Sequence, residues 1–194
     1  MKFKIYKFNS VTSTNDEAIR LIREKRKIFG CVYADTQTKG RGTHRNKWIS
    51  KKGNLFSSLF FPLKEIYPTT EEFTAINPVI VSDTIKKFCH IGKISLKFPN
   101  DIFLNGKKIC GLLQEVITLE NKKYLIIGIG INVISNPKIN NKYEATNILL
   151  ETKKKPIIIE IIKSIISSYE KFFLKLNIYN YKKYVNKVQS ISFN

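Results

Sequence analysis

The feature that most constrains the fold is a series of apolar segments separated by two tight-turn signals, between residues 94 and 134. Asn105-Gly106 is the dipeptide most typical of a two-residue hairpin, and the polar stretch 120–123 marks a second turn. The flanking segments, 94–104, 107–119 and 124–134, are apolar enough to be strands of a sheet. We therefore expect a meander of consecutive antiparallel strands.

Three more strands are expected before this meander. Alternating residues predict a strand that ends at Phe8, and a second strand enters a loop within 31–42. A third, Leu55–Phe61, follows a turn and is stopped by Pro62. Together with the helices described next, these strands predict one α+β domain with a mixed, largely antiparallel sheet flanked by helices.

Apolar residues at helical spacing predict three helices. The first begins near Thr14, which has capping-box spacing with a glutamate three residues later. The second covers 73–88, where Pro78 makes the early turns uncertain. The third, 158–173, has an apolar stripe typical of a core helix, and Pro156 is expected at its first position.

The composition excludes several classes of protein. A hydrophobic content of 43% with 12% aromatic residues supports a folded core, and no apolar run approaches the length of a membrane span. The N-terminus lacks the apolar stretch of a secretory signal. Three cysteines without CxxC spacing predict reduced thiols and a cytoplasmic location, and two distant histidines argue against zinc.

The net charge of +19 allows three interpretations. It is compatible with a nucleic-acid ligand, with an acidic partner, or with the lysine-rich and asparagine-rich composition that an A/T-rich genome produces. The lysines are scattered along the chain and form no dense basic arm. Charge alone therefore does not identify a ligand.

A glycine-containing basic segment, TKGRGTHRNKW over 38–48, is the first candidate site. Glycine amides in the Gly40-Arg41-Gly42 stretch can approach an anion closely, and the arginine can donate a forked pair of hydrogen bonds to it. A solvated loop, a nucleic-acid patch and a cradle for a phosphorylated small molecule all remain open for this segment.

A second candidate, KFPNDIFLNGKK, places charged residues around the hairpin signal. Lys97, Asn100 and Asp101 are expected at the end of a strand, and Lys107 and Lys108 follow just past the turn. A carboxylate among lysines suits a magnesium-bound nucleotide, with the carboxylate toward the metal and the lysines toward the phosphates. An ordinary charged hairpin would have the same composition.

Two further segments carry weaker signals. Gly128 and Gly130 interrupt an apolar strand, which predicts a bulge or a closely approaching ligand. Ser13 and Thr14, at the start of the first helix, are either simple cap residues or hydroxyl donors in a pocket.

In this order and spacing, the four segments resemble the catalytic domain of biotin protein ligases. The family pattern reads roughly S-T-N, then Q-x-x-GRGRRGR-x-W with a later G-x-N-L, then KWPND with a following lysine and glycine, then GxGIN. The matching positions here are Ser13-Thr14-Asn15, Gln37, Trp48, Ser50, Gly53-Asn54-Leu55, Lys97-Phe98-Pro99-Asn100-Asp101, Lys108, Gly111 and Gly130-Ile131-Asn132. The segment Tyr143–Leu150 also resembles a later family motif.

The resemblance covers about residues 6–176 and implies a fold like that of class II aminoacyl-tRNA synthetases. It implies a single catalytic domain over 1–194, without an N-terminal DNA-binding domain. Residues 177–194 are then a tail, in which the family's C-terminal β domain is absent or reduced.

The resemblance also implies a reaction in two steps. Biotin and ATP, with Mg²⁺, give biotinyl-5′-AMP and pyrophosphate, and a lysine of a biotin carboxyl carrier domain then takes the biotin. No nucleic acid and no membrane are expected as partners, and family members occur as monomers and as homodimers. The excess of basic residues is then interpreted as steering the enzyme toward an acidic carrier domain.

Site residues follow from the resemblance position by position. Lys108 is the expected cation between carboxylate and phosphate, Arg41 should clamp the same centre, and Asp101 is the expected Mg²⁺ ligand. Contacts to biotin are expected from Ser13, Thr14, Asn15, Gln37, Gly40, Arg41, Gly42, Lys108 and Gly111. Contacts to ATP or the adenylate are expected from Arg41, Thr43, Arg45, Trp48, Lys97, Asn100, Lys108, Gly130 and Asn132.

The chain departs from the family in its glycine-rich loop. Thr43 stands where an arginine is usual, and Arg45 where a glycine is usual. Because a hydrogen bond to a charged group contributes about 1.5–3 kcal/mol, we expect weaker retention of the adenylate, roughly tenfold to a hundredfold. Arg45 is the residue that would compensate.

Two rival functions stay open from the sequence. A lipoate or octanoate ligase shares the fold, but it is expected to carry an R-R-x-S-G-G-G loop that this chain lacks. A nucleic-acid-binding module would use the basic surface and bind in a strongly salt-dependent way. That second alternative leaves the KFPND and GIGIN segments unexplained.

Overall fold

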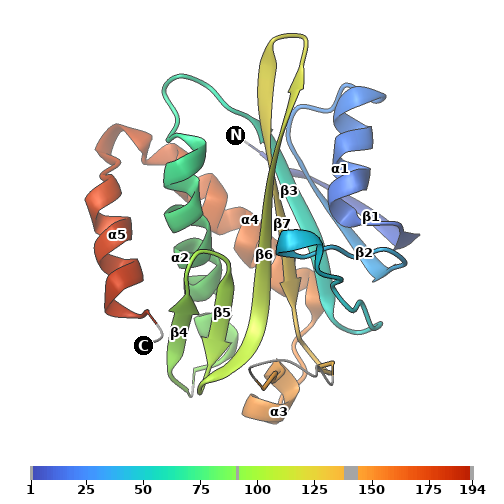
Figure 1. Cartoon of the computed structure of the whole chain (residues 1–194), viewed down its shortest axis with the longest axis vertical. Helices are drawn as coiled ribbons and strands as arrows, with labels where there is room; N and C mark the ends of the chain where they lie inside the picture. Colours follow the sequence, from blue (N-terminus) through green and yellow to red (C-terminus); the bar gives the residue numbers. More distant parts are fainter. Residues whose placement is uncertain (1, 91, 138–143, 193–194) are drawn as a thin grey trace.

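The computed structural model describes residues 2–90, 92–137 and 144–192, apart from the Arg45 side chain. Its centre is a seven-stranded sheet in the order β1-β2-β3-β7-β6-β5-β4 (Figure 1). The strands are β1 (Lys4–Val11), β2 (Gly30–Gln37), β3 (Leu55–Pro62), β4 (Ile94–Lys97), β5 (Asp101–Leu104), β6 (Lys107–Leu119) and β7 (Lys122–Ile131). Only β1 and β2 pair parallel, and the other neighbours pair antiparallel, which confirms the predicted α+β fold.

Helices cover both faces of this sheet. They are α1 (Thr14–Arg23), α2 (Thr70–Phe88), α3 (Ile148–Thr152), α4 (Ile158–Leu174) and α5 (Tyr181–Ser190), with short 3₁₀ turns at Thr43–Arg45 and Leu176–Ile178. Helix α1 packs on one face, against β2, β3 and β7, whereas α2 packs with α4 and α5 on the other. None of the described helices is both long and apolar enough to span a lipid bilayer.

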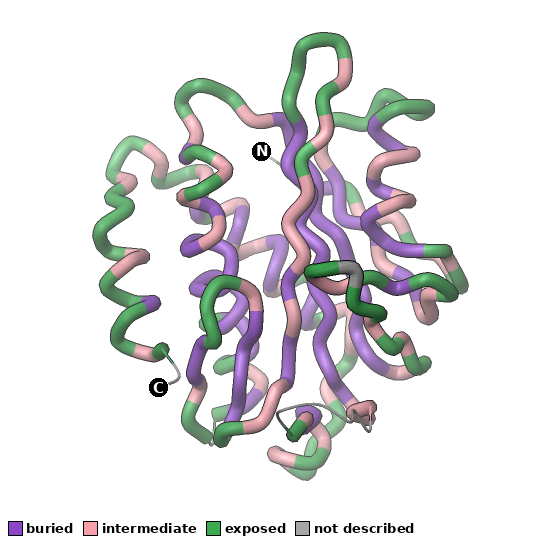
Figure 2. Tube along the Cα trace, viewed as in Figure 1, coloured by how far each residue is buried: buried purple, intermediate pink, exposed green. Residues whose placement is uncertain are grey.

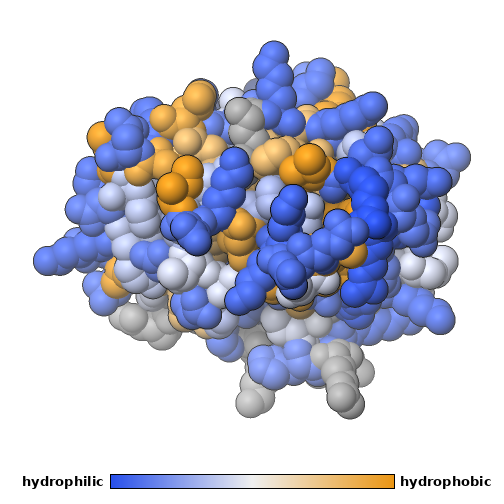
Figure 3. All heavy atoms as spheres, turned by 90° about the horizontal axis from the view of Figure 1, so that it is seen from above, coloured by the Kyte–Doolittle hydropathy of each residue, from blue (hydrophilic) through white to orange (hydrophobic). Residues whose placement is uncertain are grey.

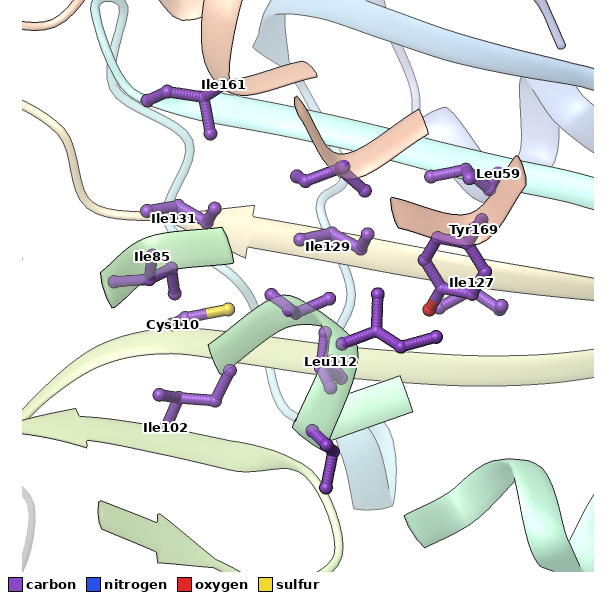
Figure 4. Packing of buried hydrophobic residues seen from close by; sticks show 14 of the residues in the cluster. Leu59, Ile85, Ile102, Cys110, Leu112, Ile127, Ile129, Ile131, Ile161 and Tyr169 are labelled. Atoms are coloured by element: carbon purple, nitrogen blue, oxygen red, sulfur yellow. The ribbon is translucent and has the colours of Figure 1, made fainter. Parts of the chain in front are cut away.

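The core has two parts because strand residues alternate between the two faces. Cys31, Leu59 and Ile127 face α2 and α4, whereas their neighbours Val32 and Phe60 face α1. Figure 2 shows that the central strands are buried along most of their length. Figure 4 shows the larger part, where side chains from the two helices interdigitate with those of β3, β6 and β7.

All three predicted helices form, but each differs from the prediction in the details of its start. Ser13, not Thr14, is the N-cap of α1, and its side chain makes no capping hydrogen bond. A capping box does form at α2, where Thr69 and Glu72 bond reciprocally, so that helix begins at Thr70 and continues through Pro78. Pro156 lies just before the N-cap of α4, Ile157, and not at its first position.

The predicted meander is confirmed, with one addition. Asn105 and Gly106 both have positive φ and connect β5 to β6. The segment 94–104 divides into two antiparallel strands, because a turn with a cis Phe98-Pro99 bond reverses the chain. Lys97 and Asp101 therefore face each other across that turn as register partners.

The segment expected as a tail is folded onto the domain. Helix α5 packs against α2, and Val188 is buried in the main core. Just after the helix, the carbonyl of Ile191 accepts a hydrogen bond of 2.7 Å from the amide of Leu96 in β4. The described part of this segment is thus helical and contains no β hairpin.

Candidate active site

One cavity of about 560 Å³ brings the four sequence segments together. The start of α1, the loop after β2, the β4–β5 turn and strands β6 and β7 all contribute to its walls. The predicted site residues that line it are Ser13, Thr14, Asn15, Gln37, Arg41, Gly42, Thr43, Trp48, Lys97, Asn100, Asp101, Lys108, Gly111, Gly130 and Asn132. Gly40 is buried and is not among the lining residues, and the Arg45 side chain lies outside the described residues.

Lys108 and Asp101 form the buried ion pair of this cavity. The Lys108 Nζ lies 2.7 Å from Asp101 Oδ1, and the two side chains are only 19% and 11% exposed. Asn100 Nδ2 also approaches this carboxylate oxygen, at 3.3 Å. Lys108 in addition lies 5.6 Å from the centre of the Trp48 ring, a cation–π arrangement. The ammonium is thus held in place on the cavity wall.

This pairing bears on the predicted magnesium ligand. Asp101 is the carboxylate among the lining residues, and its Oδ1 is directed to Lys108. The described residues contain no group of three or more histidine, cysteine or acidic side chains able to hold a metal. Asp101 serves here as the counter-ion of Lys108, and a single carboxylate would hold Mg²⁺ only together with nucleotide phosphates and water, so the metal role of Asp101 stays a prediction.

Trp48 lies against a pair of glycines that face each other across β6 and β7. Gly111 and Gly130 are register partners, and a Cβ on either would come within 2.6 Å of the indole ring. The register of β7 is regular here, so the glycines make no bulge, and the group that approaches closely is the protein's own indole. The indole Nε1 is buried and has no hydrogen-bond partner among the residues that the structure describes.

Arg41 contacts two carboxylates and not the Lys108–Asp101 pair. Its guanidinium donates to Asp16 Oδ1 and, at 2.9–3.0 Å, to both carboxylate oxygens of Glu115. Partial burial lowers the pKa of Arg41, but the two carboxylates more than offset it, so the net shift is upward. Arg41 lines the same cavity, and its predicted role at the reacting centre stays a prediction.

The STN segment forms a hydrogen-bonded group with Gln37. The Thr14 amide and hydroxyl both donate to Gln37 Oε1, at 2.8 and 3.2 Å. The Asn15 side-chain Nδ2 donates to Glu115 Oε2 at 2.6 Å, and the Ser58 hydroxyl contacts the side chains of both Thr14 and Asn15. Thr14 thus uses its side chain in the cavity and not in a capping box.

Asn132 and Asn54 organise the wall after β7. The Asn132 side-chain Nδ2 donates to the Thr146 carbonyl at 3.0 Å and so joins this wall to the segment before α3. Asn54 Oδ1 accepts from three consecutive amides, Val133, Ile134 and Ser135. Asn54 belongs to the G-x-N-L part of the family pattern, but nothing local in the sequence indicates a bond across about eighty positions.

The glycine-rich loop is folded on itself. The Trp48 amide donates to the Gly40 carbonyl at 2.9 Å, and Arg41 and Lys47 form an antiparallel bridge. Between them, Thr43 starts a short 3₁₀ turn, and its hydroxyl accepts from Asn100 Nδ2 at 3.4 Å. Thr43 therefore connects this loop to the β4–β5 turn.

Comparison with known proteins places this arrangement in a family. Residues 6–132 match the model of the biotin/lipoate A/B protein ligase family. The chain belongs to that family. As a biotin/lipoate A/B ligase family member, it carries its motif residues on the elements that surround the cavity.

Two curated relatives share this part of the chain. The bifunctional ligase/repressor BirA of Bacillus subtilis is 36% identical over 129 residues, which are 66% of this chain and 39% of that protein. A protein of Paracoccus denitrificans named biotin–[acetyl-CoA-carboxylase] ligase is 27% identical over 129 residues, 64% of this chain and 52% of that protein. The matches thus span about half or less of those relatives.

Two solved structures extend the likeness to nearly the whole of this chain. Biotin protein ligase of Aquifex aeolicus, in complex with biotin and ATP, has a TM-score of 0.81 and 28% identity, covering 98% of this chain and 78% of that chain. The Leishmania major enzyme, in complex with biotinyl-5-AMP, has a TM-score of 0.84 and 26% identity, covering 98% and 81%. The first of these structures thus holds biotin and ATP, and the second holds biotinyl-5-AMP.

Proposed function

We propose that this chain is a biotin protein ligase. In the first step a biotin carboxylate oxygen attacks the α-phosphorus of ATP, a P–O bond forms, and pyrophosphate leaves. In the second step a lysine amine of an acceptor protein attacks the acyl carbon of biotinyl-5′-AMP. The C–N bond of an amide forms, the bond to the phosphate oxygen breaks, AMP leaves, and the amine gives up a proton.

The observation that carries this proposal is the position of Lys108. Its ammonium is largely buried on the wall of a cavity whose other walls come from the STN, GRG and GIGIN segments. The first step brings a carboxylate and a triphosphate together, so its main barrier is electrostatic repulsion. A preorganised cation in a partly dehydrated cavity lowers that barrier most where negative charge develops.

In the proposed mechanism Lys108 faces the carboxylate and the α-phosphate. Asp101 keeps the ammonium oriented before the substrates arrive, and the phosphate oxygens compete with it for the same protons. Lys97, opposite Asp101 at the β4–β5 turn, is placed to meet the outer phosphates. No step is assigned to Mg²⁺; Asp101 would hold the ion together with the phosphates of ATP and water, and the ion would then neutralise phosphate charge.

The rest of the cavity suits the two organic parts of the intermediate. Thr14, Asn15 and Gln37 offer polar groups for the ureido ring of biotin, while Leu113, on the same face of β6 as Gly111, supplies apolar wall for its bicycle and chain. Trp48 offers a flat face to the adenine, and the loop that carries it excludes water that would hydrolyse the anhydride.

The acceptor in this proposal is the carrier domain of a biotin-dependent carboxylase. The name of the Paracoccus denitrificans relative supports it, and so does the excess of basic residues, which favours an acidic partner. A cytoplasmic location is part of the same proposal, supported by three cysteines that are all free and buried.

The test is a comparison of two neighbouring lysines. Purified protein is mixed with biotin, ATP and Mg²⁺, and pyrophosphate release and biotinyl-AMP are measured, with lipoate as a parallel substrate. Lys108→Gln is expected to lower the rate about a hundredfold or more, as loss of an electrostatic catalyst does. Lys107→Gln is the control, because Lys107 is exposed and pairs with Glu144 outside the cavity. Adenylation of lipoate but not of biotin would overturn the proposal.

A further inference from the structure

Both ends of the glycine-rich loop, residues 38–48, are tied to the same polar network. At its start, Arg41 donates to Asp16 and Glu115. At its end, the Trp48 carbonyl accepts from the Ser50 hydroxyl at 3.3 Å, and Ser50 in turn accepts from Gln37 Nε2 at 2.9 Å. The two attachments meet inside the cavity wall through the Thr14–Gln37 and Asn15–Glu115 hydrogen bonds.

Glu115, on β6, is the only residue that links Arg41 to the STN segment among the hydrogen bonds of the described chain. Its carboxylate accepts from Arg41 Nη2 at 2.9 and 3.0 Å, and its Oε2 accepts from Asn15 Nδ2 at 2.6 Å. Neither the family motifs nor the periodicity of the sequence singles out this residue. Glu115 lies outside the residues that line the cavity, so it acts through its two partners.

The Asn15 side chain is fixed tightly by its surroundings. Asn15 is only 2% exposed, and its Oδ1 lies 2.6 Å from where a Cβ of Gly128 would be. The missing side chain at Gly128 therefore makes room for this amide, and the Leu113 carbonyl accepts a second, longer hydrogen bond from it at 3.4 Å. Because a buried amide needs partners, loss of the Glu115 carboxylate leaves its N–H group poorly satisfied.

We propose that Glu115 is a positioning residue that couples the biotin pocket to the glycine-rich loop. Through Asn15 it orients an amide that faces the ureido ring, and through Arg41 it holds the loop that carries Trp48. This inference rests on the proposed function for the identity of the ligand. The loop anchor itself does not depend on any ligand.

Asp16 gives Arg41 its second carboxylate and makes the anchor a charged cluster. The Arg41–Asp16 pair and the Arg41–Glu115 pair are each partly exposed, at 38% for Arg41 and 30% for Glu115. Each pair alone contributes modestly because solvent screens it. The geometry is nevertheless specific, since Arg41 bridges to Lys47 across the loop, and this bridge carries the anchor over to Trp48.

Two substitutions at Glu115 separate its two contacts. Glu115→Gln keeps an oxygen that can accept from Asn15 and removes the charge that holds Arg41. Glu115→Ala removes both. Glu120→Gln is the matched control, because it removes an exposed carboxylate that pairs with Arg26 at the far end of the same strand pair.

The first readout needs no ligand. Trp48 is the only tryptophan of the chain, so acrylamide quenching of its fluorescence reports how well the loop covers the indole. Both Glu115 variants are expected to increase the quenching constant about twofold, as expected when a weak, partly exposed ion pair is lost, whereas Glu120→Gln leaves it unchanged. Equal quenching in all four proteins would overturn the loop half of the inference.

The second readout is the affinity for biotin, measured by calorimetry, together with KM and kcat for adenylation. Glu115→Ala is expected to raise both the Kd and the KM for biotin about tenfold, as loss of one hydrogen bond to a pocket amide does. Glu115→Gln is expected to stay within about twofold in both, with kcat similar in the two variants. Equal loss of affinity in the two would overturn the Asn15 half.

The failure of the proposed function would look different. If the wild-type protein bound no biotin, the proposed function would fall, while the quenching comparison would still decide whether Glu115 anchors the loop. If Glu115→Ala did not fold, the loop anchor would be tested with Arg41→Met, Glu115→Gln and the double variant. Non-additive quenching in that pair supports the anchor, and additive quenching overturns it.

Discussion

The indole of Trp48 covers Gly130, because a Cβ added to that glycine would lie 2.5 Å from the indole Cε2 atom. The same ring covers the neighbouring Gly111 on β6. The two glycines in the GIGIN and KKICG segments thus create a flat backbone surface onto which one aromatic side chain fits. Placement of Trp48 depends on a surface formed by residues more than sixty positions later.

Gly130→Ala is expected to displace the indole. Overpacking of this kind costs about 1–3 kcal/mol of stability, and adenylation should fall at least about tenfold because the adenine wall moves. The emission maximum of the single tryptophan should shift to the red as the ring is exposed. Gly106→Asn is the control, since nothing lies within 4 Å of its Cβ position and asparagine tolerates a positive φ. An unchanged emission spectrum in Gly130→Ala would contradict this prediction.

Lys108 and Asp101 are expected to be energetically coupled. Each of Lys108→Met and Asp101→Asn leaves a partly buried partner without its counter-charge, so each should lower the free energy of unfolding by about 1–3 kcal/mol. The double variant should lose less than the sum of the two. Chemical denaturation of the four proteins gives the coupling energy, and strict additivity would show that the 2.7 Å pair contributes nothing.

Thr43→Arg is expected to improve retention of the adenylate. Thr43 lines the cavity, so an arginine there can reach the phosphate, and one added charge-assisted hydrogen bond should slow dissociation of biotinyl-AMP about tenfold to a hundredfold. Release of the labelled adenylate into a chase of unlabelled ligand measures this rate. Thr38→Arg adds the same charge outside the cavity lining and should leave the rate unchanged. Equal effects of the two would show that only net charge matters.

The three cysteines are expected to resist thiol–disulfide exchange in the folded protein. Burial raises the pKa of Cys31 to about 12 and that of Cys89 to about 11, and it also raises the pKa of Cys110. A raised pKa means less thiolate at a given pH, roughly one part in a thousand at pH 8 for a pKa near 11. A disulfide reagent should therefore label the native protein slowly, faster as pH rises, and all three thiols at once in denaturant. Rapid labelling at pH 8 would contradict this burial.

Association with the acceptor is expected to slow as salt rises. The net charge is +19, and hydrophilic side chains predominate on the face seen in Figure 3, with hydrophobic ones in small separate groups. Salt screens the electrostatic steering of an acidic carrier domain, so the rate of the second step should fall about tenfold or more between low and high ionic strength. Adenylation of the small substrates serves as the internal control. If both steps depend on salt equally, charge acts on the cavity and not on docking.

Local patterns predicted the framework because they depend on residues close together in the chain. The Asn105-Gly106 turn and the apolar stripe of α4 formed as expected, since a turn dipeptide and a helical period are both local properties. The wrong predictions also came from patterns of residues close together in the chain. Thr14 and Glu17 have the spacing of a capping box, yet Gln37 and Ser58 take the Thr14 side chain instead.

The candidate site likewise has a part that the sequence predicted and a part that it did not. The motifs identified which residues line the cavity, including Lys108 and Trp48, because the residue types and order of the segments are written in the sequence. The partners of those residues were not predictable. Arg41 finds Glu115 across 74 positions, and Asn54 reaches the amides after β7 across about eighty.

By itself, the sequence determined helices α1, α2 and α4, the turns on either side of β6, and the set of chemical groups available to one cavity. The tertiary structure alone decided that Arg41 is held by Asp16 and Glu115, that Asp101 neutralises Lys108, and that Trp48 lies on two glycines. The physical reason is that an ion pair or a ring contact forms between whichever groups the packed sheet brings within a few ångströms. Which groups those are is set by strand order and register, and not by spacing along the chain.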